Sequence, residues 1–199
     1  MPYSHVAFDP VVAALFRYLC PATLLDIGPG AGKYGRLMKD AEQGVFFKCV
    51  KTAVEINPQY VEQFQLAAIY DEIWQMDASA IVTSRPDLNG ELAVCGDVIE
   101  HFPKSRGVDL IEFLLYRFRQ VLVVFPIDLP QDAWEGHAAE AHLSLWYPED
   151  FQRYKASTCV WKTPEGYSMC LALMNGVFVP ANQRVRLSVS NDQVEIRTG

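Results

Sequence analysis

Short apolar runs alternate with helical stretches through residues 23–125. Each run has four to six residues, which is too short for a stable helix and typical of a strand buried on both faces. Each helical stretch has one apolar face. In the third stretch this face consists of Ile111, Leu114, Leu115 and Phe118. The alternation predicts an α/β fold with a doubly wound, mostly parallel sheet. The runs are residues 23–27, 50–55, 73–76, 92–95 and 121–125.

The alternation ends after residue 126. Residues 127–147 have no period of 2 or 3.6, and a loop of this length in a compact domain is usually functional or disordered. Residues 158–161 and 169–174 flank a Pro-Glu-Gly turn, which predicts a hairpin and hence an antiparallel edge of the sheet. Residues 184–190 and 193–197 predict a second hairpin.

The composition is that of a globular protein and excludes several classes. Half of the 199 residues are hydrophobic, and the formal net charge is -7. An acidic chain has no global basic surface for phosphates, so we expect no nucleic-acid partner. The five cysteines contain no C-x-x-C pair, so we expect reduced thiols. No signal peptide or membrane span is recognisable, and we therefore expect a cytoplasmic protein without a membrane partner.

A glycine-rich turn, residues 26–32 (DIGPGAG), directly follows the first run. Glycines allow a backbone to approach a ligand closely and to adopt positive φ. Counted from Gly30, the turn matches the dinucleotide fingerprint Gly30-x-Gly32-x-x-Gly35, and Glu55 follows at the required distance of about 20 residues. This spacing is consistent with an NAD(P)-dependent oxidoreductase, which is one possible function of the protein.

Counted from Asp26, the same turn resembles motif I of the class I S-adenosylmethionine-dependent methyltransferases. Residues 53–57 (AVEIN) resemble the second strand of that family, whose acid binds the ribose hydroxyls. Residues 75–78 (QMDA) resemble the third, whose aspartate accepts the adenine amino group, and residues 95–102 (CGDVIEHF) resemble the small-molecule form of the fourth. The resemblance implies a Rossmann-like, seven-stranded sheet in the order 3-2-1-4-5-7-6 and S-adenosylmethionine as the cofactor.

The charges of the expected site agree with that resemblance. Asp26, Glu55, Asp77 and Asp97 follow four strands, whose carboxyl ends meet at one crevice in a doubly wound sheet. Four carboxylates would repel a pyrophosphate but suit a sulfonium cation, a diol and an amino-bearing base. The residues expected to bind the cofactor are Asp26, Gly28, Pro29, Gly30, Gly32, Glu55, Ile56, Asp77, Ala78, Asp97 and Val98.

The substrate side is expected in residues 127–147 and just after the fourth strand. Transfer from a sulfonium needs mainly alignment of the acceptor, and a general base is optional. His101 and His142 are the candidate catalytic bases, because histidine titrates near neutral pH. His137, His142 and Trp146 are the candidate substrate-binding residues. His137, Glu140 and His142 have metal-binding donor types, but their spacing matches no strong zinc pattern, so we expect no metal.

We therefore expect one methyltransferase domain that methylates oxygen or nitrogen of a small molecule. The fourth strand lacks the N/D-P-P-Y/F sequence associated with nucleic-acid amino groups. A non-catalytic S-adenosylmethionine-binding protein is a further alternative. The C-terminal hairpin could extend the sheet, cover the site or pair across a homodimer. The expected parts are a leading helix (1–22), a cofactor-binding half (23–126), a substrate loop with the edge hairpin (127–175) and the extra hairpin (176–199).

Overall fold

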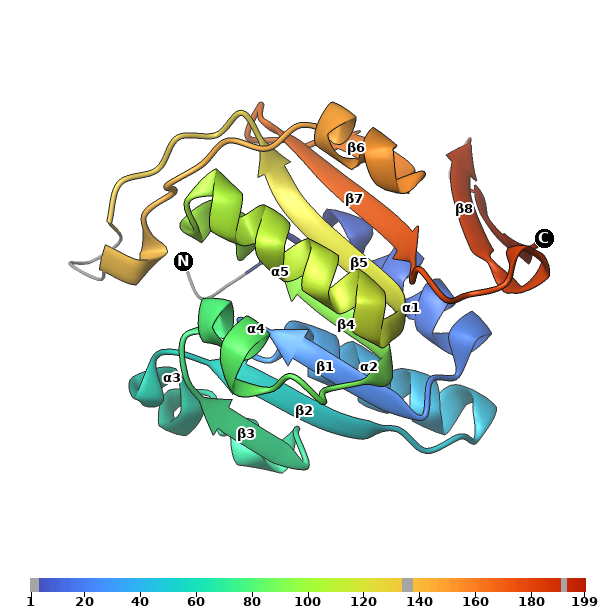
Figure 1. Cartoon of the computed structure of the whole chain (residues 1–199), viewed down its shortest axis with the longest axis horizontal. Helices are drawn as coiled ribbons and strands as arrows, with labels where there is room; N and C mark the ends of the chain where they lie inside the picture. The colour runs from blue at the N-terminus through green and yellow to red at the C-terminus, as the bar shows by residue number, and fades with distance from the viewer. Residues whose placement is uncertain (1–3, 134–137, 191–192) are drawn as a thin grey trace.

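The computed structural model describes residues 4–133, 138–190 and 193–199. Within them, seven strands form one sheet in the order β3-β2-β1-β4-β5-β7-β6 (Figure 1). The first five strands pair in parallel, and β7 is antiparallel to both of its neighbours. The expected doubly wound sheet and its antiparallel edge are confirmed. The strands are β1 (Thr23–Ile27), β2 (Val50–Glu55), β3 (Glu72–Gln75), β4 (Gly90–Gly96), β5 (Phe118–Ile127), β6 (Ser157–Lys162) and β7 (Ser168–Asn175).

Helices cover both faces of this sheet, which explains the near-continuous apolar residues of its central strands. In Figure 1, α5 lies in front of the sheet, and α1 and α2 lie behind it. Neighbouring residues of β1 enter different cores: Leu24 packs with Met38 of α2, and Leu25 packs with Leu110 of α5. The helices are α1 (Asp9–Leu19), α2 (Lys33–Val45), α3 (Pro58–Gln63), α4 (Ile81–Ser84) and α5 (Lys104–Arg117).

The boundary between α5 and β5 differs from the sequence expectation. Phe118 continues the apolar spacing of the helix, but α5 ends at Arg117 and Phe118 is extended, as the first residue of β5. Its side chain enters the same core as Leu114 and Leu115. Apolar spacing cannot separate the last residue of a helix from the first residue of a strand when both face one core.

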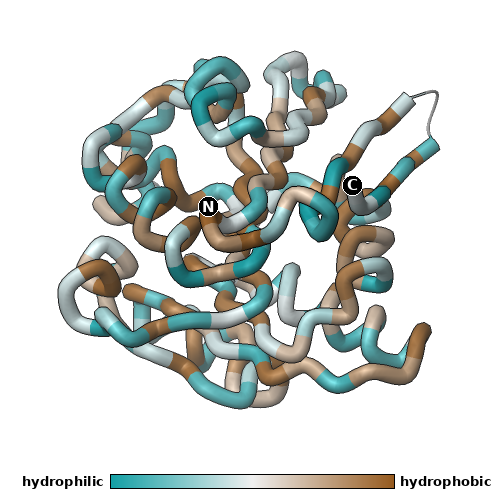
Figure 2. Tube along the Cα trace, turned by 45° about the vertical axis from the view of Figure 1, so that its right-hand side comes forward, coloured by the Kyte–Doolittle hydropathy of each residue, from teal (hydrophilic) through white to brown (hydrophobic). Residues whose placement is uncertain are grey.

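The C-terminal hairpin consists of β8 (Val185–Ser190) and β9 (Gln193–Thr198), which form their own two-stranded sheet. Figure 2 shows hydrophobic and hydrophilic residues alternating along it, as expected for a hairpin with one buried face. Val185 and Leu187 are buried in the core that contains α1. The Leu187 N–H also donates to Ser157 Oγ of β6 at 3.1 Å. The hairpin thus packs beside the main sheet without joining its ladder.

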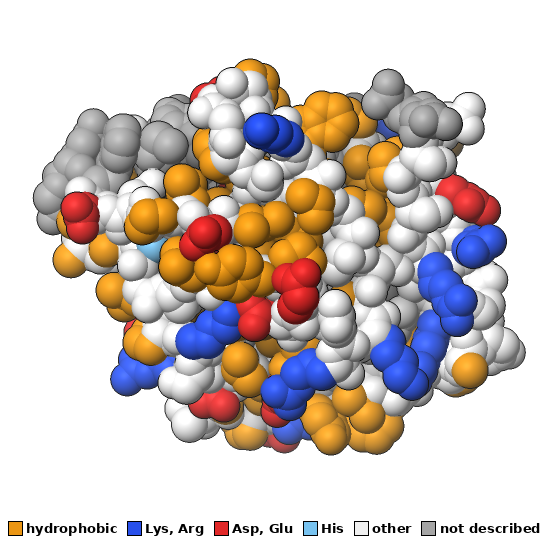
Figure 3. Space-filling model, turned by 90° about the horizontal axis from the view of Figure 1, so that it is seen from above, with side chains coloured by type: hydrophobic (Ala, Val, Ile, Leu, Met, Phe, Trp, Pro, Cys, Tyr) orange, Lys and Arg blue, Asp and Glu red, His pale blue; other side chains and the backbone are white. Residues whose placement is uncertain are grey.

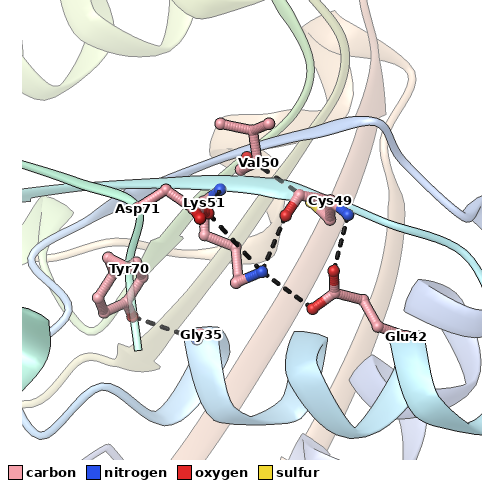
Figure 4. Close-up of polar contacts among 7 residues, drawn as sticks. All are labelled: Gly35, Glu42, Cys49, Val50, Lys51, Tyr70 and Asp71. Atoms are coloured by element: carbon pink, nitrogen blue, oxygen red, sulfur yellow. Dashed lines mark hydrogen bonds and ion pairs between the residues drawn. The ribbon is translucent and has the colours of Figure 1, made fainter. Parts of the chain in front are cut away.

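A buried ion pair joins α2 to the start of β2 (Figure 4). Lys51 Nζ donates to Glu42 Oε2 at 2.9 Å and to the Cys49 carbonyl at 2.8 Å. The other oxygen of Glu42 accepts the Cys49 N–H at 2.7 Å. Lys51 is only 8% exposed, so the pair is largely shielded from solvent.

The outer surface mixes charge types. Figure 3 shows Lys and Arg side chains interspersed with Asp, Glu and hydrophobic ones on the face that it presents. The helices of the described residues all fall short of the length and apolar content that a bilayer span requires.

Candidate functional site

A cavity of about 560 Å³ lies at the carboxyl ends of β1 to β4. This is the edge at which a doubly wound sheet binds its ligands. Ser4 contributes from the N-terminal segment, and other lining residues come from the start of α5 and from the loop after β5. The sequence-predicted cofactor residues that line the cavity are Gly28, Gly30, Glu55, Ile56, Asp77, Ala78, Asp97 and Val98.

The glycine turn owes its shape to backbone geometry. Gly28 has φ +65°, and a Cβ atom there would lie 2.6 Å from Cγ2 of Val98, so only glycine fits. Gly32 has φ +79°, precedes α2 and donates its N–H to the Pro29 carbonyl at 2.7 Å. Pro29 and Gly32 are absent from the cavity lining among the described residues. Both therefore shape the turn from outside the cavity.

Asp26 lies beneath the turn and does not line the cavity in the described structure. The Tyr70 hydroxyl donates to Asp26 Oδ2. The Gly35 N–H of α2 donates to the Tyr70 hydroxyl at 3.2 Å, and Figure 4 shows this second bond. Asp26 is fully buried, and this burial raises its pKa to about 7. Tyr70 could not be predicted from the sequence, because no motif covers the segment before β3.

Glu55 connects β2 to the glycine turn. Its Oε1 accepts the Asn57 N–H at 2.8 Å, and its Oε2 accepts the Gly30 N–H at 3.4 Å. Burial raises the pKa of this carboxyl group, while the backbone N–H groups lower it. Asp77, after β3, uses Oδ1 to accept the Ser79 N–H at 2.8 Å. Both acids are thus held in place by backbone donors.

Asp97 occupies a strained position after β4. Its φ is +52°, a conformation that L-residues with a side chain rarely adopt. Its N–H donates to the Val124 carbonyl at 2.8 Å. Burial raises the pKa of Asp97, and the nearby charge of Lys33 lowers it. Oδ2 is buried without a hydrogen-bond partner among the described residues.

His101 lines the cavity, and His142 packs beside it. Their ring centroids are 5.0 Å apart, with the rings at 70°. His101 Nδ1 lies 3.1 Å from the Ala141 carbonyl, and His142 Nδ1 lies 2.6 Å from the Leu129 carbonyl. Burial lowers the pKa of both rings, which keeps them neutral at pH 7. The two candidate bases are therefore brought together, although they are 41 positions apart in the sequence.

Trp146, a candidate substrate-binding residue, is not among the described residues that line the cavity. It is 1% exposed and packs against Phe151, and its Nε1 donates to the Ile99 carbonyl at 3.2 Å. Its indole ring packs in the core. A tryptophan in the sequence can either pack in the core or contact a ligand, and the sequence alone does not distinguish the two. His137 lies outside the described residues. The loop instead reaches the cavity through Ala138, Ala139, Glu140 and Leu143.

The charge of the cavity is predominantly acidic. Glu55, Asp77, Asp97 and Glu140 line it, and Arg106 is the one Lys or Arg side chain in the lining that the described residues provide. Four acids were expected from four strand ends, but the fourth comes from the loop after β5 in place of Asp26. Glu140 accepts a hydrogen bond from the Tyr60 hydroxyl at 2.9 Å. Such a cavity favours a ligand with a positive charge and hydrogen-bond donors.

Solved structures with this fold include several methyltransferases. An O-methyltransferase family protein from Burkholderia thailandensis matches 85% of this chain with a TM-score of 0.55 and 9% identity. This chain spans 56% of the length of that protein. The plantazolicin methyltransferase BamL, solved with a triazolic desmethyl analogue and S-adenosylhomocysteine, matches 86% of this chain over 85% of its own, with a TM-score of 0.53 and 12% identity.

The N-methyltransferase NodS from Bradyrhizobium japonicum WM9, solved with S-adenosylhomocysteine, matches 86% of this chain over 88% of its own. Its TM-score is 0.58 and its identity 12%. No protein-family model and no curated protein sequence matches the chain. At these identities the similarity establishes the Rossmann-like fold of class I methyltransferases.

Proposed function

We propose that this protein is a methyltransferase that transfers the methyl group of S-adenosylmethionine directly to oxygen or nitrogen of a small molecule. The observation that carries the proposal is the acidic cavity at the carboxyl ends of β1 to β4. S-adenosylmethionine offers a sulfonium cation, a ribose diol and an adenine amino group, each of which an acid can accept or neutralise. A dinucleotide would bring a pyrophosphate, which these acids repel.

The proposed roles follow the places of the residues around the cavity. Glu55 accepts the ribose hydroxyls, and Asp77 accepts the adenine amino group. Gly28, Gly30, Asp97 and Val98 surround the methionine part, and Ile56 and Ala78 pack on the adenosine. Asp26, Pro29 and Gly32 support the cofactor indirectly, because they hold the turn and do not reach the cavity.

The acceptor is proposed to enter between η4 (Ile99–His101), the start of α5 and the loop after β5. Direct displacement on an activated methyl group depends mainly on aligning the acceptor atom with the S–CH3 axis. A neutral histidine at this point can accept a proton from an acceptor hydroxyl, and His101, backed by His142, is in the position to do so. The triazolic desmethyl analogue bound to the plantazolicin methyltransferase BamL supports a small-molecule acceptor.

The first experiment is thermal unfolding with S-adenosylmethionine, S-adenosylhomocysteine, NAD or NADP, each at about 1 mM. A ligand present at about 100 times its dissociation constant adds about 2.7 kcal/mol to stability. We expect the midpoint to rise with the two sulfur ligands and not with the dinucleotides. A rise with a dinucleotide alone would contradict the proposal and favour the NAD(P)-dependent oxidoreductase. Cofactor binding without turnover in an acceptor screen would favour a non-catalytic binding protein.

We also propose a cytoplasmic location. All five cysteines are free thiols in the described residues, and two of them, Cys95 and Cys170, are fully buried. Reduced cysteines are typical of proteins in a reducing compartment.

A further inference from the structure

Three metal-ligating side chains from two separate segments meet beside the cavity. Glu100 and His101 belong to η4, and His142 belongs to the loop after β5. Each has a candidate ligand atom, and these atoms all lie within 4.8 Å of one another. The sequence did not reveal this group, because the 41 positions between the two histidines fit no short metal motif.

Both histidines have their Nδ1 atom next to a backbone carbonyl. Nδ1 of His101 and Nδ1 of His142 each face a backbone carbonyl, from Ala141 and Leu129 respectively. A carbonyl only accepts hydrogen bonds, so each Nδ1 carries the proton and each Nε2 has a free lone pair. A ring N–H donated to a backbone carbonyl is the usual companion of a metal-ligating histidine, because it fixes the tautomer and the ring orientation.

Glu100 provides the independent observation. Its side chain is 2% exposed, and Oε2 has no hydrogen-bond partner among the described residues. A buried carboxylate without a partner is costly, and a bound cation removes that cost. The backbone of Glu100 also holds the group together, since its carbonyl accepts the Leu143 N–H at 2.7 Å and the Ser144 N–H at 3.1 Å. These two bonds keep His142 next to η4.

We propose that Glu100, His101 and His142 bind a divalent first-row transition-metal ion at the edge of the cavity. Two imidazole nitrogens and one carboxylate oxygen suit Zn²⁺, Fe²⁺ or Mn²⁺. Two ligands that are each about 2.1 Å from one ion lie at most about 4.2 Å apart, so the group needs to close by only a small distance. Three protein ligands leave coordination positions for water or substrate.

The use of the ion rests on the proposed function. His101 lines the cavity, so an open coordination position can face a hydroxyl acceptor. The ion lowers the pKa of the bound hydroxyl, which releases its proton to water. The resulting oxygen attacks the methyl carbon, the C–O bond forms as the S–C bond breaks, and the electron pair of that bond stays on sulfur. With the ion bound, the two histidines hold it and the proton goes to water, so that His101 accepts the proton only in the ion-free protein.

The test is a metal titration of untagged, metal-free protein without cofactor. Mn²⁺ alone is followed by the loss of the free-ion EPR signal, and Zn²⁺ alone by competition with a chromogenic chelator. We expect one ion per chain. We expect Glu100→Gln, His101→Ala and His142→Ala each to weaken binding by more than about 10-fold, since even the loss of a group bonded to a ligand costs about 10- to 100-fold. His5→Gln is the matched control and retains full affinity.

The outcomes separate the two proposals. An unchanged affinity in all three variants would assign the ion to cysteine thiols or to other surface groups and would overturn the site. So would the absence of stoichiometric binding by either ion. If a variant does not fold, the Co²⁺ absorption spectrum of the wild-type protein reports nitrogen and oxygen ligands against thiolates. Binding of S-adenosylmethionine is measured separately, so a metal site without cofactor binding would contradict only the proposed function.

Discussion

At the scale of single residues, Asp26 couples the glycine turn to solution pH. The pKa of Asp26 is raised by burial from 3.8 to about 7. Between these values the folded protein keeps a proton that the unfolded chain releases, so the free energy of unfolding falls as pH rises from about 4 to about 7. Asp26→Asn removes this dependence and retains an oxygen for the Tyr70 hydroxyl.

We expect the free energy of unfolding of Asp26→Asn, measured relative to wild type, to be about 2 to 3 kcal/mol higher at pH 8 than at pH 5. Urea unfolding at both pH values measures this gain. Asp40→Asn, at an exposed position of α2, is the control and should follow the wild-type pH dependence. Parallel curves for Asp26→Asn and wild type would mean that Asp26 is already ionised in the folded protein.

Asp77 provides a test of the proposed adenine contact. Loss of a hydrogen bond to a charged group costs about 1.5 to 3 kcal/mol, so Asp77→Ala should weaken S-adenosylmethionine binding by about 10- to 100-fold in calorimetry. Asp77→Asn keeps the oxygen that accepts the Ser79 N–H and should lose less. Asp87→Ala, an exposed acid outside the cavity lining, should bind normally. An unchanged dissociation constant for Asp77→Ala would remove this residue from the site.

Candidate site residues that belong to motifs at strand ends could be predicted from the sequence. Residues that reach the site only through contacts between distant segments could not. Glu55 and Asp77 were found because parallel strands carry their terminal acids to one edge. Asp26 was expected in the cavity, but Tyr70 binds its carboxylate below the turn. Glu100 was not singled out, because only the folded loop brings His142 next to it. Such contacts between distant segments leave no local pattern.

At the scale of secondary-structure elements, the Lys51–Glu42 pair fastens β2 to α2. Breaking a buried pair outright costs about 3 to 5 kcal/mol, but Lys51 Nζ also lies 3.8 Å from Asp71 Oδ2. Glu42→Gln should therefore lower the free energy of unfolding by less than this amount, and adding Lys51→Met should recover a large part. Glu62→Gln, at an exposed position of α3, is the control. Equal losses in the single and double variants would show that Glu42 acts mainly through its bond to the Cys49 N–H.

The C-terminal hairpin is a separate structural support. Leu187 is 6% exposed and packs in the core with α1, and the hairpin contributes no described residue to the cavity. Leu187→Ala should cost about 2 to 4 kcal/mol in chemical unfolding and leave S-adenosylmethionine affinity unchanged. Ser188→Ala, exposed on the same strand, should be neutral. A weakened affinity in Leu187→Ala at full folding would mean that the hairpin influences the cofactor site.

Element types were predictable because hydrophobic period separates buried strands from amphipathic helices. The boundaries of the elements were harder to predict. The apolar side chain of Phe118, for example, fits both the pattern of the end of α5 and that of the start of β5. The arrangement of the second hairpin also required the structure. Its alternating residues predict one buried face but do not say which surface covers it.

At the scale of the whole molecule, charge favours the proposed cofactor over its product. The chain has a formal net charge of -7, and the cavity is lined by four acids. S-adenosylmethionine has one more positive charge than S-adenosylhomocysteine. Raising the salt concentration from about 50 to 500 mM shortens the Debye length from about 14 to about 4 Å and should weaken S-adenosylmethionine binding more than S-adenosylhomocysteine binding. Equal salt dependence would show that the acids do not act on the sulfonium.

The fold as a whole was predictable although the similar solved structures named above share only 9–12% of their residues with this chain. Many sequences satisfy the same alternation of buried strands and covering helices. The acceptor is a different matter, because it depends on a few side chains in an irregular loop. An irregular loop has no sequence periodicity, so the sequence does not predict which of its side chains point into the cavity.

The two hydrogen bonds from Leu143 and Ser144 to the Glu100 carbonyl define how the acceptor pocket can be redesigned. An exchange of the entire loop would remove the two bonds that hold it to η4, so a chimera built that way would change the wall of the cavity along with the acceptor. The side chains of Ala138 and Ala139 line the cavity and are small. Substitutions at these two positions can narrow the pocket while its scaffold stays intact, and they are the natural starting library for changing acceptor preference.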